Sequence, residues 1–335
     1  MRRLSCLLIL MVTMMLIGCV REDNHANTPM GNFEALWTII DEHYCFLDYK
    51  QIDWYEIRKR YQPFVHENLN NDKLFQILSN MLAELKDGHV NLYAYHNTAR
   101  YWNWFEDYPR NYSEELVEKY LGHDYRVSGG LRYTIFDDNI GYVSYTSFSA
   151  AAGNNALNEM FRYLDICNGL IIDVRCNGGG DLTNASRLAG RFTNEKVLVG
   201  YMCHKTGKGH SDFSKPEAMY IDPSDGIRWQ KPVVVLTNRH SYSATNDFVN
   251  SMRYMPQVTL MGDQTGGGSG MPFSSELPNG WGVRFSACPT YDANMQQIEF
   301  GIEPDIAVGL DANDQAQGFD TIIEAARAYL NKKPQ

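Results

Sequence analysis

Residues 233–252 read VVVLTNRHSYSATNDFVNSM, and this stretch decides the fold. Its first four residues form a continuous apolar run, which is typical of a β-strand buried on both faces. Phe248, Val249 and Met252 then recur at helical spacing, so the chain passes from a strand through a polar turn into a helix. Ser243 lies at the entry to that helix, where free N–H groups can stabilise an oxyanion. It is a candidate nucleophile, with a helix N-cap as the alternative.

Strands and helices alternate on both sides of this stretch. Apolar or alternating runs predict strands at 131–136, 140–144, 170–174, 197–202, 233–236 and 258–261. Helical spacing lies between several of them and near the end, at 155–164, 183–192, 243–255 and 319–330. This alternation predicts an α/β domain over residues 131–335 with a largely parallel sheet.

The preceding part of the chain has a helical pattern. Apolar residues recur at intervals of three and four from residue 32 to about residue 94. We therefore predict a helical N-terminal subdomain over residues 31–97. Residues 98–130 are aromatic and irregular, and they form a connecting segment.

The first residues carry an export signal. Arg2 and Arg3 precede an apolar core at 7–17, which is short for a membrane span. The ending Leu-Ile-Gly-Cys at 16–19 resembles a bacterial lipobox, which implies removal of residues 1–18 and a lipid on Cys19. Residues 19–30 are then a tether, and the expected location is the cell envelope, anchored by lipid. The alternative is a plain signal peptide with an incidental cysteine.

Charge and cysteine usage exclude several classes of function. The net charge is −10 and there is no Lys/Arg block, so we expect no nucleic-acid partner. The cysteines are scattered without zinc-ligand spacing, so no metal site is predicted. Free thiols are expected, and the alternative is a disulfide of unassigned pairing in an oxidising compartment.

A second informative segment is GLIIDVRCNGGGDLTNASRLAG at 169–190. Gly178, Gly179 and Gly180 follow an apolar strand that ends near Asp173 and precede a helix. Glycine there lets backbone N–H groups approach a ligand closely. No Gly-Lys-Ser/Thr follows, so an oxyanion hole is a better interpretation than a phosphate site.

Four motifs in this order carry a resemblance to a known family: IIDVRCNGGG, VLTNRHSYSATNDF, GDQTGGGSG and GIEPDIAV. They resemble the C-terminal processing peptidases and the tricorn-like serine peptidases. Upstream, NFEALWTIIDEHYCFLDYKQIDW and LAELKDGHVNL resemble the helical region of the tricorn-like branch. The resemblance implies a ClpP/crotonase-like, sandwich-like α/β catalytic core. Too little chain lies between His89 and Ile140 for the PDZ domain that many members carry.

The resemblance also implies roles for individual residues. Ser243 matches the nucleophile, and its oxyanion donors would be the N–H of Ala244 and that of Gly178 or Gly179. The processing-peptidase branch uses a lysine base where this chain has glycines at 266–268. No lysine occurs between Lys231 and Lys332, so a serine–lysine dyad at that place is excluded.

The tricorn-like branch uses a histidine instead, and His89 matches it. Neutral imidazole can accept the serine proton and return it to a leaving amine. Glu299 matches the glutamate that orients this histidine. The branch has a serine where this chain has Gly88, so the relay is rerouted, through Asp87 or through Glu299 directly. His240 is a rival base that more plausibly shapes the turn.

These features predict a membrane-tethered, extracytoplasmic serine endopeptidase that needs no cofactor. Its substrates would be peptides or unfolded protein tails, cleaved through an acyl-enzyme on Ser243. One alternative is a non-catalytic ligand-binding protein on the same scaffold. Another is an esterase or other acyl hydrolase with the same nucleophile.

Overall fold

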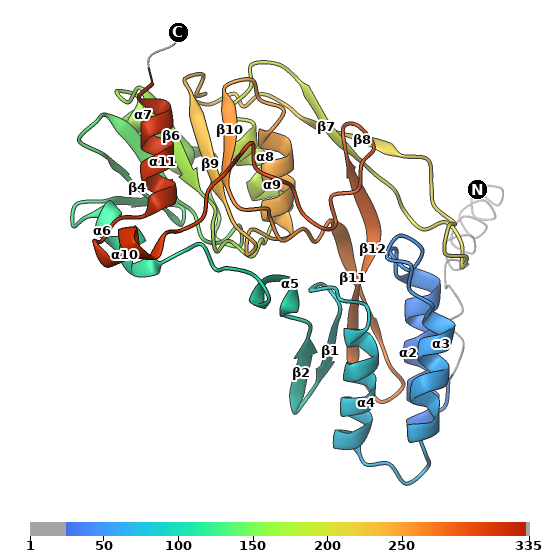
Figure 1. Ribbon diagram of the computed structural model, residues 1–335. Coiled ribbons are helices and arrows are strands. Elements are labelled where there is room, and N and C mark those ends of the chain that lie inside the picture. Colours follow the sequence, from blue (N-terminus) through green and yellow to red (C-terminus); the bar gives the residue numbers. More distant parts are fainter. Residues whose placement is uncertain (1–24, 333–335) are drawn as a thin grey trace, which may run out of the picture.

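Two β-sheets organise the computed structural model, which describes residues 25–332 (Figure 1). The predicted signal segment 1–18 and the lipidation residue Cys19 lie outside the described residues. The α/β fold class is confirmed by the arrangement of the elements and by its structural neighbours.

The first sheet has seven strands, and its centre is parallel. Neighbouring strands from β13 to β5 run parallel, whereas β4 pairs antiparallel with β5 and β3 pairs antiparallel with β4. Every residue of β5, β6 and β9 is buried, as the continuous apolar runs predict. The strand order is β13 (Ile306–Ala307), β10 (Val258–Gly262), β9 (Val233–Thr237), β6 (Gly169–Asp173), β5 (Ile140–Ser144), β4 (Leu131–Ile135) and β3 (Arg126–Ser128).

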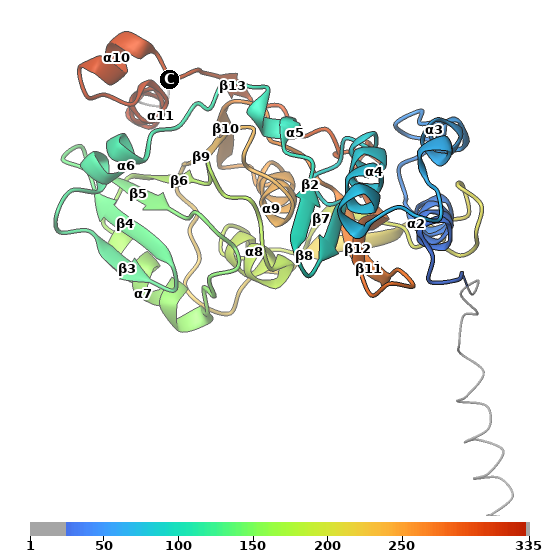
Figure 2. The same ribbon diagram turned by 90° about the horizontal axis from the view of Figure 1, so that it is seen from below.

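Helices cover both faces of this sheet (Figure 2). Ile172 and Val235 point to the face covered by α7 (Asn154–Leu164), α8 (Leu182–Ala189) and α9 (Ala244–Met252). Their neighbours Ile171 and Val234 point to the opposite face, with α6 (Glu114–Leu121) and α11 (Thr321–Leu330). Successive residues of a strand alternate between faces, so a fully apolar strand supplies both cores. A short helix, α10 (Ala312–Ala316), precedes α11.

The second sheet is antiparallel and was not predicted. Residues 197–202, expected in the parallel layer, form β7 here, and residues 91–94, expected in a helical region, form β1. Both expectations were wrong because β1 and β7 are recognised by pairing with β12, which lies far away in the sequence. The order is β2 (Asn97–Arg100), β1 (Asn91–Ala94), β12 (Gly282–Asp292), β7 (Val197–Met202) and β8 (Glu217–Ile221), and β11 (Gly270–Glu276) also pairs with β12.

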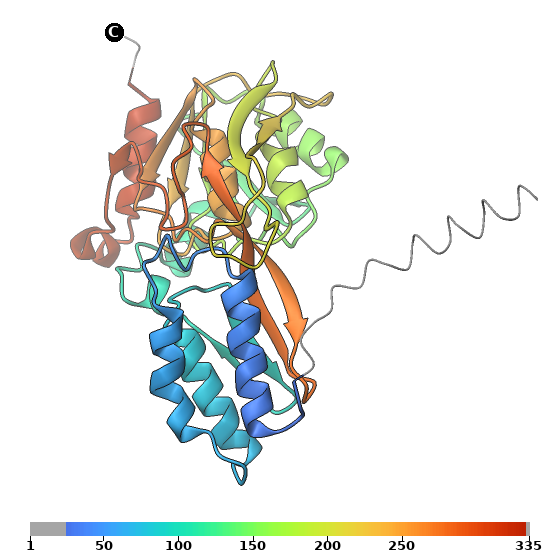
Figure 3. The same cartoon turned by 90° about the vertical axis from the view of Figure 1, so that its right-hand side faces the viewer.

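Three N-terminal helices pack against this second sheet (Figure 3). They are α2 (Pro29–His43), α3 (Trp54–Tyr61) and α4 (Asn71–Ala83), as the helical spacing predicts. Each begins at a side-chain cap, provided by Thr28, Asp53 and Asn70 respectively. A 3-10 turn, η1 (Gln62–Phe64), follows α3, and a short helical turn, α5 (Asn103–Glu106), follows β2. Phe33 and Leu78 share a core with Val283 and Phe285 of β12, so the helical region is fixed to the rest of the molecule.

Within residues 25–332, no helix has both the length and the apolar character needed to cross a membrane. The five cysteines in this range are free thiols. The same range contains no group of three His, Cys, Asp or Glu side chains arranged to hold a metal ion.

Candidate active site

Ser243 sits at the junction of β9 and α9 in an unusual backbone conformation. Its φ of 59° and ψ of −125° are rare for a residue with a side chain, and such conformations cost about 1–3 kcal/mol. The backbone is held there by the Ser243 N–H, which donates to the carbonyl of Gly267 at 2.9 Å. Although Ser243 occupies the N-cap position, its side chain makes no capping hydrogen bond. The hydroxyl is therefore left for another partner, and the N-cap alternative is wrong for this side chain.

That partner is His89. Its Nε2 atom lies 2.9 Å from the Ser243 Oγ, although 154 residues separate the two in the sequence. His89 lies between α4 and β1, on the side of the antiparallel sheet, and it is 3% exposed. The ring packs against that of Tyr242, with a centroid separation of 5.0 Å. A nucleophile and a base are thus in hydrogen-bond contact.

The environment of His89 keeps the imidazole neutral. Burial lowers its pKa to about 4, although the nearby carboxylate of Asp87 acts in the opposite direction and the charge of Arg284 adds to the lowering. The Nδ1 atom has no hydrogen-bond partner within the described part of the chain. At neutral pH the ring is therefore unprotonated and able to accept a proton from Ser243.

This pKa predicts the acid limit of any reaction that uses His89 as a base. The base works in its neutral form, so the rate should hold as pH falls from 8 to 5 and drop only as pH passes through about 4. The rate of Ser243 acylation by a fluorophosphonate probe, measured across this range with circular dichroism to follow folding, would test this. A fall in the rate centred near 6.5, the ordinary pKa of histidine, would contradict this prediction.

Asp87 organises the turn that carries His89. Its Oδ1 accepts the backbone N–H of His89 at 2.7 Å, and its Oδ2 accepts the hydroxyls of Tyr44 and Ser286, each at 2.9 Å. The carboxylate is fully satisfied and buried, and it connects α2's end, the His89 turn and β12. It therefore fixes the position of His89 through the backbone.

Glu299 does not contact His89, although the resemblance implies that it orients this residue. Its carboxylate accepts the Ser269 N–H at 2.9 Å and pairs with the Nζ of Lys50 at 2.8 Å. Lys50 lies 3.6 Å from Asp87 on its other side. The route from Glu299 to His89 thus runs through Lys50 and Asp87, the first of the two routes left open by the sequence.

Lys50 supplies the positive charge between the carboxylates of Glu299 and Asp87, and it influences the pKa of both. Burial raises the pKa of Glu299 to about 7, and Lys50 acts against the rise. Burial also acts to raise the pKa of Asp87, but Lys50 and His89 outweigh it and the pKa is lowered. For Lys50, burial is outweighed by Glu299 and Asp87, so its pKa is raised. Lys50 and Asp87 are therefore charged at neutral pH, and Glu299 titrates near it.

The departure at Gly88 has a steric reason. A Cβ atom at this position would lie 2.4 Å from Nε1 of Trp104 and 3.0 Å from the hydroxyl of Tyr242. Trp104 stacks on Tyr242 with a centroid separation of 3.9 Å, so it has little freedom to move. The indole occupies the space that a serine side chain at residue 88 would need.

The glycine loop lies against the nucleophile. A Cβ at Gly179 would be 2.8 Å from the Cβ of Ser243 and 3.0 Å from the N atom of Ala244. The Gly179 N–H already donates to Asn177 Oδ1 at 3.0 Å, whereas those of Gly178 and Ala244 donate to no described residue. Gly178, Gly180 and Ala244 therefore have N–H groups without a partner among the described residues, and Gly180 borders the cleft.

No lysine lines the cleft around Ser243, within the part of the chain that the structure describes. Side chains at 266–268 would meet backbone or aromatic atoms at 2.4 Å or less. The cleft has a volume of ≈ 90 Å³ and is lined by His89, Ser243, Asp247, Arg284 and neighbouring residues of the 268–272 segment.

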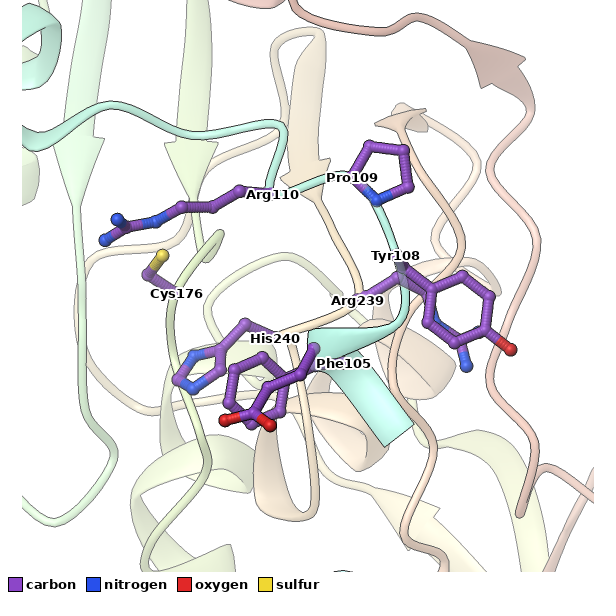
Figure 4. A pocket seen from close by; sticks show the side chains of 8 residues that line it. Phe105, Tyr108, Pro109, Arg110, Cys176, Arg239 and His240 are labelled. Carbon is purple, nitrogen blue, oxygen red and sulfur yellow. The ribbon is translucent and has the colours of Figure 1, made fainter. Parts of the chain in front are cut away.

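A larger cavity of ≈ 440 Å³ lies beside the turn that precedes Ser243 (Figure 4). Arg110, Cys176, Arg239 and His240 line it together with aromatic side chains from the 105–108 segment. Neither Ser243 nor His89 borders it, so its size does not make it the reaction site. His240 faces this cavity, stacks on Trp104 and makes an edge-to-face contact with Phe105, as expected for a residue that shapes the turn.

Sequence reasoning missed Lys50, Tyr44 and Ser286 as parts of the site. Tyr44 and Lys50 lie within the upstream motif at 32–54, which was quoted for its resemblance only. The available signal was the position of Lys50 among aromatic residues, which suggests that its ammonium is buried. A buried cation needs carboxylate partners, so this lysine could have been assigned to a buried ion pair. Ser286 gave no signal, because its role depends on the position of β12.

Models of two protein families match parts of this chain. The model of peptidase family S41 matches residues 139–308, and that of the tricorn protease C1 domain matches residues 25–83. A carboxy-terminal-processing protease of Bartonella bacilliformis is 24% identical over 202 residues, 59% of this chain and 43% of that protein. The tricorn protease of Thermoplasma acidophilum is 23% identical over 210 residues, 58% of this chain and 18% of that protein. The chain spans less than half the length of both.

Solved structures extend the similarity to nearly the whole chain. A Parabacteroides merdae protein of known crystal structure is 55% identical, with a TM-score of 0.89 over 92% of this chain and 98% of that one. Mature CPAF, solved in complex with lactacystin, shares the fold with a TM-score of 0.72 at 11% identity, over 91% of this chain and 97% of that one. The predicted relationship to the C-terminal processing and tricorn-like peptidases is confirmed, and the chain belongs to peptidase family S41.

Proposed function

We propose that this chain is a serine endopeptidase in which Ser243 is the nucleophile and His89 is the general base. The observation that carries this proposal is the 2.9 Å contact between His89 Nε2 and Ser243 Oγ, in a cleft that Gly180 of the glycine loop also borders. Membership of a peptidase family supports a peptide or protein substrate.

The reaction has two steps, acylation of Ser243 and hydrolysis of the resulting ester, and His89 is the base in both. Ser243 Oγ attacks the scissile carbonyl carbon while its proton passes to His89 Nε2. The negative charge on the carbonyl oxygen is stabilised by the free N–H groups of Ala244 and Gly178. The intermediate then expels the amine, which takes the proton from His89, and an ester on Ser243 remains. Water, deprotonated by His89, hydrolyses this ester and frees the serine.

In this proposal Asp87, Lys50 and Glu299 are positioning residues. Asp87 holds the His89 turn through the backbone and its negative charge stabilises the imidazolium that forms in each step. Lys50 and Glu299 fix Asp87 in turn. A lysine base has no place in the scheme, because residues 266–268 are glycines without space for side chains.

A fluorophosphonate probe tests the nucleophile directly. We expect it to label Ser243 in the wild-type protein, because the probe forms a stable ester analogue only with an activated serine. A peptide library, compared with simple esters, then identifies the bond that is cleaved. Absence of labelling in folded protein would favour a non-catalytic binding protein, and cleavage of esters without peptides would favour an esterase.

We also propose that the protein is exported and anchored to a membrane of the cell envelope through lipid on Cys19. The support is the sequence at 16–19, after a short apolar core. In cells that express the full chain, Cys19→Ser should abolish incorporation of a labelled fatty acid and move the protein from the membrane fraction to the soluble fraction. Cys6→Ser, which changes the other cysteine of the leader, is the matched control and should change neither. Lipid labelling that survives Cys19→Ser would refute the anchor.

A further inference from the structure

Asp247 occupies a special position relative to the nucleophile. It lies on α9 four residues after Ser243, and residues four apart share one face of a helix. Asp247 borders both the cleft that holds Ser243 and His89 and an adjoining hollow of ≈ 60 Å³. Leu182, Met219 and Thr290 also line both spaces, so the hollow continues the cleft past the carboxylate.

The Asp247 carboxylate has no partner in residues 25–332. Its side chain takes part in no hydrogen bond and no ion pair of the described structure. Burial raises its pKa to about 7, and no neighbouring charge offsets this. The Asp247 side chain is only partly buried, and it opens onto the cleft that holds Ser243. An acidic group without a protein partner is therefore available there to a cationic ligand.

The other ionisable groups around these spaces leave the hollow without a cation. Arg284 borders the cleft but not the hollow, and its Nη1 lies 3.4 Å from Asn91 Oδ1, on the β1 side. His89 is neutral, and Tyr220 and Tyr291 border the hollow. On α8, which packs against α9, the guanidinium of Arg187 donates to Asn184 Oδ1.

The walls of the two spaces suit a long aliphatic side chain with a polar end. Met202, Met219 and Leu182 supply apolar surface near Ser243, and Val199 and Ile221 continue it in the hollow. The cleft has a volume of ≈ 90 Å³ and the hollow one of ≈ 60 Å³. Pockets for drug-sized ligands hold about 300–1,000 Å³, so these two spaces are small and suit a single side chain. Lysine and arginine have apolar stems that pack on such surfaces and a charged head that needs a carboxylate.

We propose that Asp247 determines specificity, by binding the cationic head of a substrate lysine or arginine whose side chain enters the cleft beside Ser243. This inference rests on the proposed peptidase function, because it names the substrate class of the same site. Asp247 contacts the substrate side chain and takes no part in proton transfer. Acidic side chains are excluded from the hollow by the same carboxylate.

The proposal has a pH signature of its own. A group with a raised pKa is protonated below it, so Asp247 is largely neutral below about pH 7 and ionised above it. Binding of a cationic side chain requires the ionised form. The preference for a cationic over an uncharged side chain should therefore increase as pH rises through about 7. Because this preference is a ratio, titration of His89 cancels from it.

Two peptides that differ at one position test the proposal on the full-length protein. The position is the residue whose carbonyl is attacked, and it carries either lysine or the uncharged norleucine. At pH 8 we expect kcat/KM to favour lysine by about tenfold or more, as for a charge-assisted hydrogen bond. Asp247→Asn should reduce this ratio to near one, through KM for the lysine peptide, and should leave kcat for the norleucine peptide within about threefold.

Asp247→Asn is close in size and should fold. Ionisation of Asp247 destabilises the folded state progressively as pH rises from the ordinary aspartate pKa of 3.8 to about 7, so the Tm of the variant should exceed that of wild type by more at pH 8 than at pH 5. A purely structural role would give this difference without any change in the lysine preference. An unchanged preference in the variant, or none in the wild type, overturns the inference.

A binding measurement separates this inference from the proposed function. Fluorescence anisotropy follows the labelled lysine and norleucine peptides on Ser243→Ala, with and without Asp247→Asn. Tighter binding of the lysine peptide that requires Asp247 supports the inference whether or not cleavage occurs. Equal binding of both peptides overturns it, while fluorophosphonate labelling of the wild type would still support the peptidase. Absence of labelling and cleavage counts against the peptidase alone.

Discussion

Ser243→Ala and His89→Ala are each expected to lower kcat by about six orders of magnitude, and the double variant should lose no more. The two side chains are in direct contact and act as one unit, because the serine is a poor nucleophile until its proton can move to the imidazole. Their losses therefore do not add. Single-turnover cleavage of the best library peptide, with each variant at high enzyme concentration, measures this.

The matched control removes a different hydroxyl on the same helix turn. Thr245 is buried, and its Oγ1 has no hydrogen-bond partner in the described chain. Thr245→Val removes a hydroxyl that makes no hydrogen bond, so activity should remain within about threefold of wild type. Losses for Ser243→Ala and His89→Ala that multiply in the double variant would show that the two residues act independently, against the proposed mechanism.

Lys50→Met is expected to be the most destabilising substitution of a charged residue in this site. The ammonium is buried, with a side-chain exposure of 6%, between the carboxylates of Glu299 and Asp87. Its removal leaves two buried acids without a cation, and breaking a buried pair in this way costs about 3–5 kcal/mol. Thermal and urea unfolding would measure the loss, and activity should fall as well, because Asp87 holds the His89 turn.

Two further variants identify the cause of this loss. In Lys50→Met with Glu299→Gln, one unpaired acid is removed, so part of the stability should return. Lys59→Met, which breaks the exposed pair with Glu56, should leave the unfolding transition unchanged. If the double variant were less stable than Lys50→Met alone, repulsion between the two acids would not be the reason for the loss.

The parallel core was predictable because its signal is local. The apolar runs that became β5, β6 and β9 are long enough to be recognised without knowledge of their neighbours. The antiparallel sheet was not predictable for the opposite reason. β1 has four residues, and β11 has a proline at 272 and a register shift beside it, so neither has the pattern of a regular strand. Pairing with β12 makes both of them strands.

The residues of the site also divide into those with a local sequence signal and those without one. Ser243 and His89 could be placed from the sequence because short motifs surround them. The position of Trp104 over Gly88 could not, since the indole comes from the irregular segment 98–130 and reaches the site only after folding. The place of Lys50 between Glu299 and Asp87 depends likewise on three segments far apart in the chain.

The separation of Ser243 and His89 onto different sheets has a consequence for when the site forms during folding. The nucleophile follows a strand of the parallel sheet, and the base precedes a strand of the antiparallel sheet, whose partner β12 is made near the end of translation. Neither sheet by itself contains both side chains of the 2.9 Å contact. A chain that lacks β12 has no partner for β1, so the contact between Ser243 and His89 requires assembly of both sheets.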